Sequence, residues 1–325
     1  MSTTTPEPTL ITTFKAADPP FDDTDADIVL RSSDNVDFYV HKWPLSRASS
    51  VFKDMFSIPS SYDSFNADNV KDGLPVVRVT EDRQTLDIVL RLCYPRDQQT
   101  LTLDVPSIRQ LLPALEKYEM LKDMTGILKP MMLAAAKTDS RAMYAIACRY
   151  QMLKLANRIA VLSRRLLSDV SFPSTIDFFS KGDLQSISGH HLCQFLMFHQ
   201  QSSSAASRAV RSDWSVFAMF SRSVSQNPPC YCSQVDFATT KGAFHGPEWL
   251  LTYCKQCEEN LRSRPHCEVV MEKELITDMC VAAAQCDACR PRARRIHTFC
   301  KKMMGGVRRA LESVPLPFPE AESKE

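Results

Sequence analysis

The apolar positions in the first 130 residues predict a small sheet and several helices. Short runs at 26–30 and 36–41 predict two strands, and Ser33-Asp34-Asn35 between them has the residue types of a hairpin turn. The spacing of apolar residues from Leu45 to Phe56 predicts one helix with an apolar face. A third strand is expected at 75–79, with Thr80 as the cap of the helix that follows. Residues 106–120 form the next predicted helix, with Ile108, Leu111, Leu112, Leu115 and Tyr118 as its buried stripe.

The remainder of the chain has mainly helical patterns. Residues 127–167 predict one continuous helix with Asp139 as a cap, and a Ser/Gly-rich break follows at 182–189. A helix begins near His190, whereas the polar stretch 200–207 predicts a loop. Two further helices are expected at 249–262 and 269–285.

Composition narrows the class of protein. The chain has 325 residues, 44% hydrophobic and 24% charged, which suits two globular domains. Lysine and arginine number 39 against 38 acidic residues, so the net charge gives no general attraction to nucleic acid or anionic membranes. Eight glycines disfavour glycine-rich phosphate loops. We find neither a secretory signal nor a membrane span, and therefore expect an intracellular protein of the cytoplasm, the nucleus or both, with reduced thiols.

Four segments together resemble a BTB (POZ) domain over about residues 20–130. They are DADIVLRSSDNVDFYVHKWPLSRASSVFKDMF, LPVVRV, LDIVLRLCYP and LLPALEKYEMLKDM. The matching marks include Asp27 before the first strand, Val40-His41-Lys42 at the end of the second, and Tyr94. The whole chain is similar to a large group of BTB proteins of mushroom-forming fungi, in which a helical region and a cysteine-bearing segment follow. Pro95-Arg96-Asp97 departs from the small-residue turn of many members, which concerns only the local loop.

The resemblance implies a fold of the α+β class: an N-terminal BTB/POZ domain (a small sheet plus helices), then a mainly α-helical region with a cysteine-rich segment. We expect a disordered leader at 1–19, the BTB domain at 20–130, and a helical extension at 131–210. A helical cysteine-rich region at 211–313 and a disordered, Pro/Glu-rich tail at 314–325 complete the division. His41 is expected to tie a strand end to the core, and Asp27 to anchor hydrogen bonds, rather than to act in catalysis.

Nine of the 12 cysteines lie between Cys230 and Cys300. Cys254, Cys257, Cys280 and Cys300 fall on apolar helix faces and are interpreted as core thiols. The pairs Cys230/Cys232 and Cys286/Cys289 instead lie in predicted loop corners. Two close pairs of thiolates are a common ligand set for zinc, so the predicted metal ligands are Cys230, Cys232, Cys286 and Cys289, around one structural Zn²⁺ ion. The alternative is four reduced surface thiols; if one ligand differs, the substitutes are His245, His266, Cys267, Cys254 and Cys257.

No nucleophile, metalloprotease, phosphate-loop or kinase motif occurs, so we expect no enzyme, no catalytic residues and no cofactor besides zinc. The eight interleaved ligands of a RING site are also absent. The predicted function is a protein-interaction module, a homodimer through the BTB domain or an adaptor to a cullin-type ubiquitin ligase scaffold, with no membrane partner. The alternative is a BTB-dimerised, DNA-associated transcriptional regulator that uses the Cys/Arg-rich segment. The basic residues from Arg290 to Arg309 are interpreted as a solvated helix face, and nucleic acid is not the expected partner.

Overall fold

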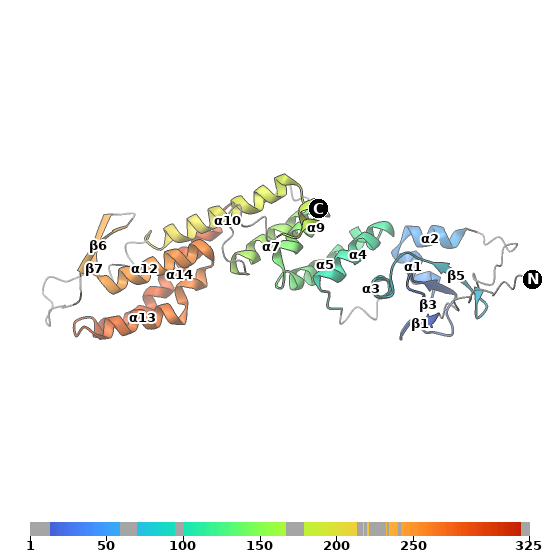
Figure 1. Ribbon diagram of the computed structural model, residues 1–325, viewed down its shortest axis with the longest axis horizontal. Coiled ribbons are helices and arrows are strands. Elements are labelled where there is room, and N and C mark those ends of the chain that lie inside the picture. The colour runs from blue at the N-terminus through green and yellow to red at the C-terminus, as the bar shows by residue number, and fades with distance from the viewer. Residues whose placement is uncertain are drawn as a thin grey trace, which may run out of the picture. The chain divides into compact units, whose positions relative to one another are not determined.

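The computed structural model divides into two compact units, residues 1–132 and 133–325 (Figure 1). It describes residues 14–58, 70–94, 101–166, 179–212, 217, 220, 232, 234–239 and 242–319. No helix in these ranges is both long enough and apolar enough to cross a membrane.

The first unit is built around a five-stranded mixed sheet of order β1-β3-β2-β5-β4. Strands β2 and β3 are antiparallel, whereas β2 and β5 are parallel, as a strand pair joined through intervening helices allows. The strands are β1 (Lys15–Ala16), β2 (Ile28–Arg31), β3 (Val36–Val40), β4 (Val70–Lys71) and β5 (Leu74–Arg78). The three strands predicted from the sequence are confirmed as β2, β3 and β5.

The turn between β2 and β3 also has the chemistry that its sequence predicts. Asn35 adopts a φ of 62°, a left-handed conformation that asparagine tolerates better than most residues. The Ser32 hydroxyl donates to Asp34 and accepts a hydrogen bond from the Val36 N–H. The hairpin is therefore fixed by its polar residues, and Val36 and Phe38 are left to enter the core.

One predicted helix is two helices in the structure. Helix α1 (Lys42–Ala48) ends where Ser49 adopts an extended conformation, and α2 (Ser50–Ser57) begins directly after it. The Ser49 hydroxyl accepts from the Phe52 N–H and donates to the Tyr118 carbonyl. An apolar period does not detect this break, because Leu45 and Phe52 are both fully buried on either side of it.

Helices α3 and α4 of the first unit lie where the sequence predicts them, but the cap of α3 is a different residue. Helix α3 (Arg83–Cys93) is capped by Asp82, which accepts from the Thr85 N–H, and not by Thr80. Helix α4 (Val105–Lys117) buries the predicted stripe of Ile108, Leu111, Leu112 and Leu115, and Tyr118 after its end is also buried.

Three charged residues of the sheet strands form a buried ion cluster. Asp37 is completely buried and receives hydrogen bonds from Arg31 (Nη2–Oδ2 3.0 Å) and Lys71 (Nζ–Oδ2 2.6 Å). Burial by itself would raise the pKa of the Asp37 carboxyl, but these hydrogen bonds outweigh it and the pKa lies below its ordinary value of 3.8.

The predicted continuous helix 127–167 is also interrupted. It is formed by α5 (Leu121–Ala135), which crosses the boundary between the units, α6 (Ser140–Arg149) and α7 (Leu153–Leu166). Asp139 caps α6 through the Ala142 N–H, as expected. Gln151, with a φ of 56°, turns the chain between α6 and α7. Both flanks of that turn are good helix formers, so propensity alone does not mark it.

Two segments predicted as irregular are helical. The Ser/Gly stretch contains α9 (Lys181–Ser186), and α10 (Gly189–Ala209) continues through 200–207, where a loop was predicted. In α10 the Ser202 hydroxyl donates to the Phe198 carbonyl one turn earlier and is fully buried. Serine hydroxyls that bond their own helix are compatible with a buried helix, although serine-rich sequences usually indicate loops.

The cysteine-rich half contains one hairpin that the sequence analysis missed. Strands β6 (Gln234–Thr239) and β7 (Gly242–Pro247) pair antiparallel, where only helices and loops were expected. Helix α12 was predicted in place, and the predicted 269–285 helix is a 3-10 turn followed by a shorter α-helix. The elements are α12 (Glu248–Ser263), η4 (Cys267–Met271), α13 (Lys273–Ala284), η5 (Arg290–Arg295) and α14 (Ile296–Glu312).

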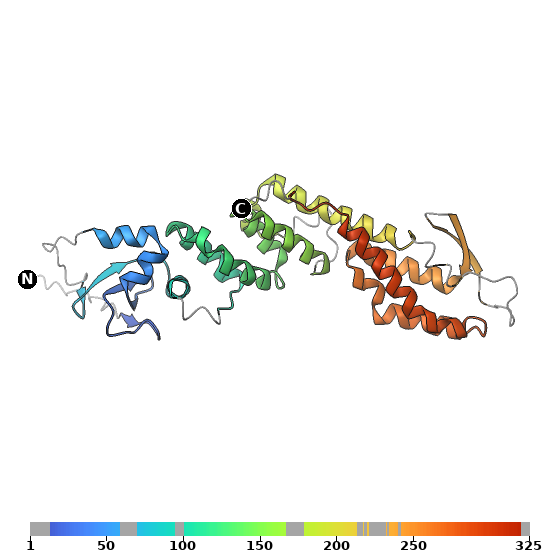
Figure 2. The same ribbon diagram turned by 180° about the vertical axis from the view of Figure 1, so that it is seen from behind.

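A hydrophobic cluster holds these elements together. Leu250, Tyr253, Phe299 and Val307 are almost completely buried in it, and α14 packs against α10 and η4 (Figure 2). Burying a side chain of this size contributes about 2 kcal/mol.

Both ends of the described chain are more ordered than predicted. Lys15–Ala16 of the expected leader pairs in parallel with β3 as strand β1. In the expected tail, Val314 and Phe318 are buried. Backbone pairing in the first case and aromatic burial in the second fix segments whose composition alone indicates disorder.

Candidate metal centre

A tight turn after α13 presents two cysteine side chains together. The Cys286 carbonyl accepts hydrogen bonds from the N–H groups of both Cys289 (3.0 Å) and Arg290 (2.8 Å). Cys286 is 6% exposed and Cys289 1%. The backbone thus folds back on itself within four residues, and both thiols are nearly excluded from solvent.

Cys232, just before β6, brings a third sulfur to the same place. Its Sγ lies 3.6 Å from the Cys289 Sγ, and the Sγ atoms of Cys232, Cys286 and Cys289 all lie within 4.8 Å of one another. Zinc–sulfur bonds of about 2.3 Å in a tetrahedron place the sulfurs about 3.8 Å apart. The three sulfurs therefore have a spacing that could hold a metal ion with only a small contraction.

The fourth predicted ligand, Cys230, lies outside the described residues. It lies two positions before Cys232 along the chain. The structure thus brings three of the four predicted ligands together, from two segments more than 50 residues apart, and the complete ligand set stays a prediction.

The substitute ligands do not join this group. Cys254 and Cys257 on α12 have no solvent exposure; burial raises the pKa of both thiols, that of Cys257 to about 12. His245 Nδ1 is 2.8 Å from Asp236 Oδ1 across the β6–β7 hairpin, and His266 Nδ1 accepts the Glu268 N–H. The interpretation of the α12 thiols as core residues is confirmed.

The two remaining helix-face cysteines differ from each other. Cys300 on α14 is fully buried, as predicted, and burial raises the pKa of its thiol to about 11. Cys280 on α13 is only partly buried and packs at the margin of the cluster, so its interpretation as a core thiol is only partly correct.

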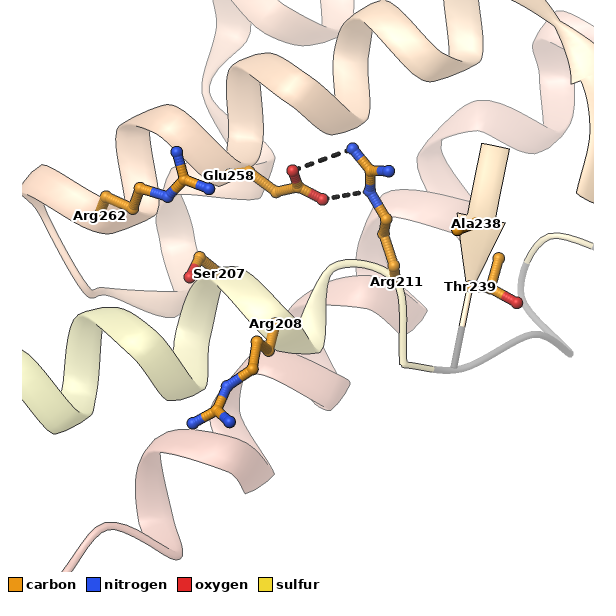
Figure 3. Close-up of a pocket in the computed structure, with 7 residues that line it drawn as sticks. All are labelled: Ser207, Arg208, Arg211, Ala238, Thr239, Glu258 and Arg262. Carbon is orange, nitrogen blue, oxygen red and sulfur yellow. Dashed lines mark hydrogen bonds and ion pairs between the residues drawn. The ribbon is translucent and has the colours of Figure 1, made fainter. Parts of the chain in front are cut away.

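A pocket of about 410 Å³ lies elsewhere in the second unit, between α10, α12 and β6 (Figure 3). An ion pair between Arg211 and Glu258, with a second hydrogen bond of 3.0 Å, occupies one side of it. Arg208 and Arg262 point away from each other. The lining residues are Ser207, Arg208, Arg211, Ala238, Thr239, Glu258 and Arg262, and the one carboxylate among them, Glu258, is paired with Arg211.

In the first unit, Asp27 and His41 form hydrogen bonds that fix the backbone at the start of α1. Asp27 Oδ1 accepts the Lys42 N–H at 2.7 Å, which confirms its role as an anchor. His41 does tie the strand end to the core, but through its own N–H, which donates to the Tyr94 hydroxyl at 2.9 Å. Its half-exposed imidazole lies 3.6 Å from Asp23 Oδ2.

The sequence analysis missed one exposed aromatic residue of the first unit. Trp43, in the first turn of α1, is 72% exposed, the highest fraction among the large apolar side chains of the described residues. Exposure of a tryptophan to water is unfavourable, and tryptophan is enriched at the centres of protein interfaces. The sequence did offer one signal of this exposure. Trp43 stands between Lys42 and Pro44, and neither neighbour extends the apolar face that begins at Leu45.

The first unit thus combines a small mixed sheet with flanking helices and carries an exposed tryptophan. Residues 20–129 match the BTB/POZ domain family. The chain therefore carries a BTB/POZ domain, generally a module for protein–protein interaction and dimerisation, followed by a mainly helical region with many cysteines. A search of curated proteins finds no match to the chain.

Proposed function

We propose that this protein is a non-catalytic interaction module that self-associates through its BTB domain. The observation that carries the proposal is the BTB match at 20–129 together with Trp43, whose indole is 72% exposed on that domain. A second copy is the occupant that the domain class favours, since BTB domains often dimerise. The indole of each copy would then be removed from water.

The test measures the mass of the full chain by size-exclusion chromatography with light scattering. We expect about twice 36.7 kDa for the protein and a shift towards 36.7 kDa for Trp43→Ala. Met197→Ala is the matched control, because Met197 is a large, exposed apolar residue (51%) of the second unit. A monomer at all concentrations, or a dimer unaffected by Trp43→Ala, would contradict the proposal.

The adaptor role is the second part of the proposal. The resemblance implies docking onto a cullin-type ubiquitin ligase scaffold, with the helical, cysteine-rich part presenting a surface to other proteins. Binding of a purified cullin N-terminal domain to the full chain tests this directly. The membership of the fungal BTB group is likewise proposed from the resemblance of the whole chain.

A structural zinc ion held by Cys230, Cys232, Cys286 and Cys289 is the third part. The convergence of three sulfurs to within 4.8 Å supports it. Zinc bound there would fix the turn after α13 to the segment before β6, and its binding free energy would add to folding because the thiolates meet only in the folded chain.

A further inference from the structure

Helix α14 has charged residues on one side and apolar residues on the other. The inner side of α14 is formed by residues that are at most 4% exposed: Ile296, Phe299, Cys300, Met303 and Val307. Its outer side carries the exposed cations Lys301, Lys302, Arg308 and Arg309, which are called the basic face below (α14 is the red helix of Figure 2).

The charge of the basic face is not neutralised within its own segment. From Arg290 to the end of α14 at Glu312 the chain contains eight lysines and arginines and one acidic residue, Glu312 itself. Arg290 pairs with Asp287, and Arg292 donates to the Phe220 carbonyl. Lys301, Lys302, Arg308 and Arg309, in contrast, form no ion pair with any residue that the structure describes. A solvated helix face usually carries charges of both signs in similar number, whereas this segment has eight cations and one carboxylate.

The cations are spaced in a regular way. Lys301 and Arg308 are seven residues apart, as are Lys302 and Arg309, so the two pairs form neighbouring rows along α14. Seven residues of α-helix rise about 10.5 Å, so each row places two cations about that far apart on one side of the helix. The rows together form an extended array of positive charge, which suits a line of closely spaced negative charges such as a phosphate backbone.

The residues between these cations decide which class of anion fits. On the outer side they include Thr298, Gly305 and Gly306, and a Cβ atom added at Gly306 would meet nothing within 4 Å. Protein interfaces have apolar or aromatic anchors at their centre and few lysines. A face of cations and small residues, without an exposed apolar anchor, fits the phosphate backbone of a nucleic acid better than an acidic protein segment.

We propose that the basic face of α14 binds the phosphate backbone of a nucleic acid without reading base sequence. This goes beyond the proposed interaction function of the BTB domain and does not require it. It also assigns a role to cations that the sequence alone indicates only as solvated.

The test measures binding of the full chain to a fluorescein-labelled 30-base-pair DNA duplex and to the RNA duplex of the same sequence, by anisotropy across a salt series. The variant is K301Q/K302Q/R308Q/R309Q. The matched control is K137Q/R158Q/K255Q/K273Q, which removes four exposed cations from other helices and turns of the same unit. Glutamine is a good helix former, so each set should leave its helices intact.

We expect log K to fall linearly with log salt for the protein and for the control. Each phosphate contact contributes about −0.9 to this slope in duplex DNA, so removing four cations should reduce the magnitude of the slope by about 3.6 and the affinity at least about 100-fold. Binding to either duplex, lost in the variant and kept in the control, supports the proposal, and the ratio of the two affinities identifies DNA or RNA as the source of the phosphates.

Three outcomes would overturn it: no binding to either duplex at 50 mM salt, equal losses in variant and control, or displacement of the duplex by polyglutamate at an equal charge concentration. The last would assign the basic face to acidic proteins. Trp43→Ala in parallel keeps the two proposals distinct, because loss of self-association leaves the four cations in place.

Discussion

The side-chain amide of Asn157 is hydrogen-bonded to both backbone groups of Phe318, although 161 positions separate them. Asn157 Nδ2 donates to the Phe318 carbonyl at 2.7 Å, and Asn157 Oδ1 accepts the Phe318 N–H at 3.0 Å. The Phe318 ring, 2% exposed, packs edge-on against His191 (ring centroids 5.2 Å apart) and near Tyr144. This contact fastens the chain after α14 onto α7, within the second unit.

Asn157→Ala should therefore destabilise the second unit. Each buried hydrogen bond contributes about 1 kcal/mol net, so the loss of two should cost about 2 kcal/mol and lower the melting temperature of this unit by about 4–8 °C. Differential scanning calorimetry measures the shift. Arg158→Ala, at the exposed neighbouring position, should have almost no effect; equal shifts in the two variants would show that the clamp does not stabilise the fold.

Zinc at the cysteine cluster can be tested by metal content and stability together. Cys286→Ser should reduce bound zinc from about one equivalent to below half and lower the melting temperature, because the remaining thiolates cannot complete a tetrahedron. Cys280→Ser is the control, since Cys280 is a partly buried cysteine of the same unit that lies outside the cluster. The protein purified without chelator and analysed for metals should contain zinc; less than half an equivalent in the unmodified chain would contradict the site.

The order of elements in the first unit could be predicted because each strand and helix has its own period and its own turn residues. The breaks between consecutive helices could not be predicted in this way. Ser49 interrupts a pattern of apolar residues that continues on both sides, and its extended conformation is stabilised by the Tyr118 carbonyl, 69 positions away. A contact of that kind has no local signal in a sequence.

The candidate metal site could likewise be predicted from the sequence only in part. Cys286 and Cys289 could be separated from the core cysteines because they follow the end of a helix, whereas Cys254 and Cys257 repeat on an apolar face. Their proximity to Cys232 depends on the fold of the whole unit, including the β6–β7 hairpin. That hairpin was missed because the alternation of polar and apolar residues is short, from Gln234 to Phe237, and is not repeated in β7.

The buried ion cluster at Asp37 predicts acid sensitivity of the first unit. Because the folded pKa of Asp37 is depressed, its contribution to stability is present above the unfolded pKa of about 3.8 and is lost as pH falls through the lower folded pKa. Urea unfolding at pH 6, 4 and 3 should show the difference in stability between the protein and Asp37→Asn shrinking as pH falls.

Asp54→Asn, which removes an exposed carboxylate of α2, provides the control for Asp37→Asn. Its stability should differ from that of the protein by a similar small amount at each pH. A difference between the protein and Asp37→Asn that stays constant down to pH 3 would mean that the carboxylate of Asp37 is not held ionised by Arg31 and Lys71.

The cysteines should react with iodoacetamide in an order set by burial, thiolate population and metal. Cys193 is exposed and should be labelled first in the native protein at pH 8. Cys148 and Cys257, with pKa values raised to about 12, hold about one thiolate in 10,000 at that pH and are also shielded by packing. They should stay unlabelled until the chain unfolds.

A chelator distinguishes the metal ligands from the other thiols in the same experiment. With chelator, Cys232, Cys286 and Cys289 should become reactive while Cys254 and Cys257 do not, because only the first three would lose a bound ion. Mass spectrometry of the labelled peptides gives both rates for every cysteine. If chelator instead exposed Cys254 and Cys257 before Cys286, the pair on α12 would be the ligands, and the loop pair would be ordinary reduced thiols.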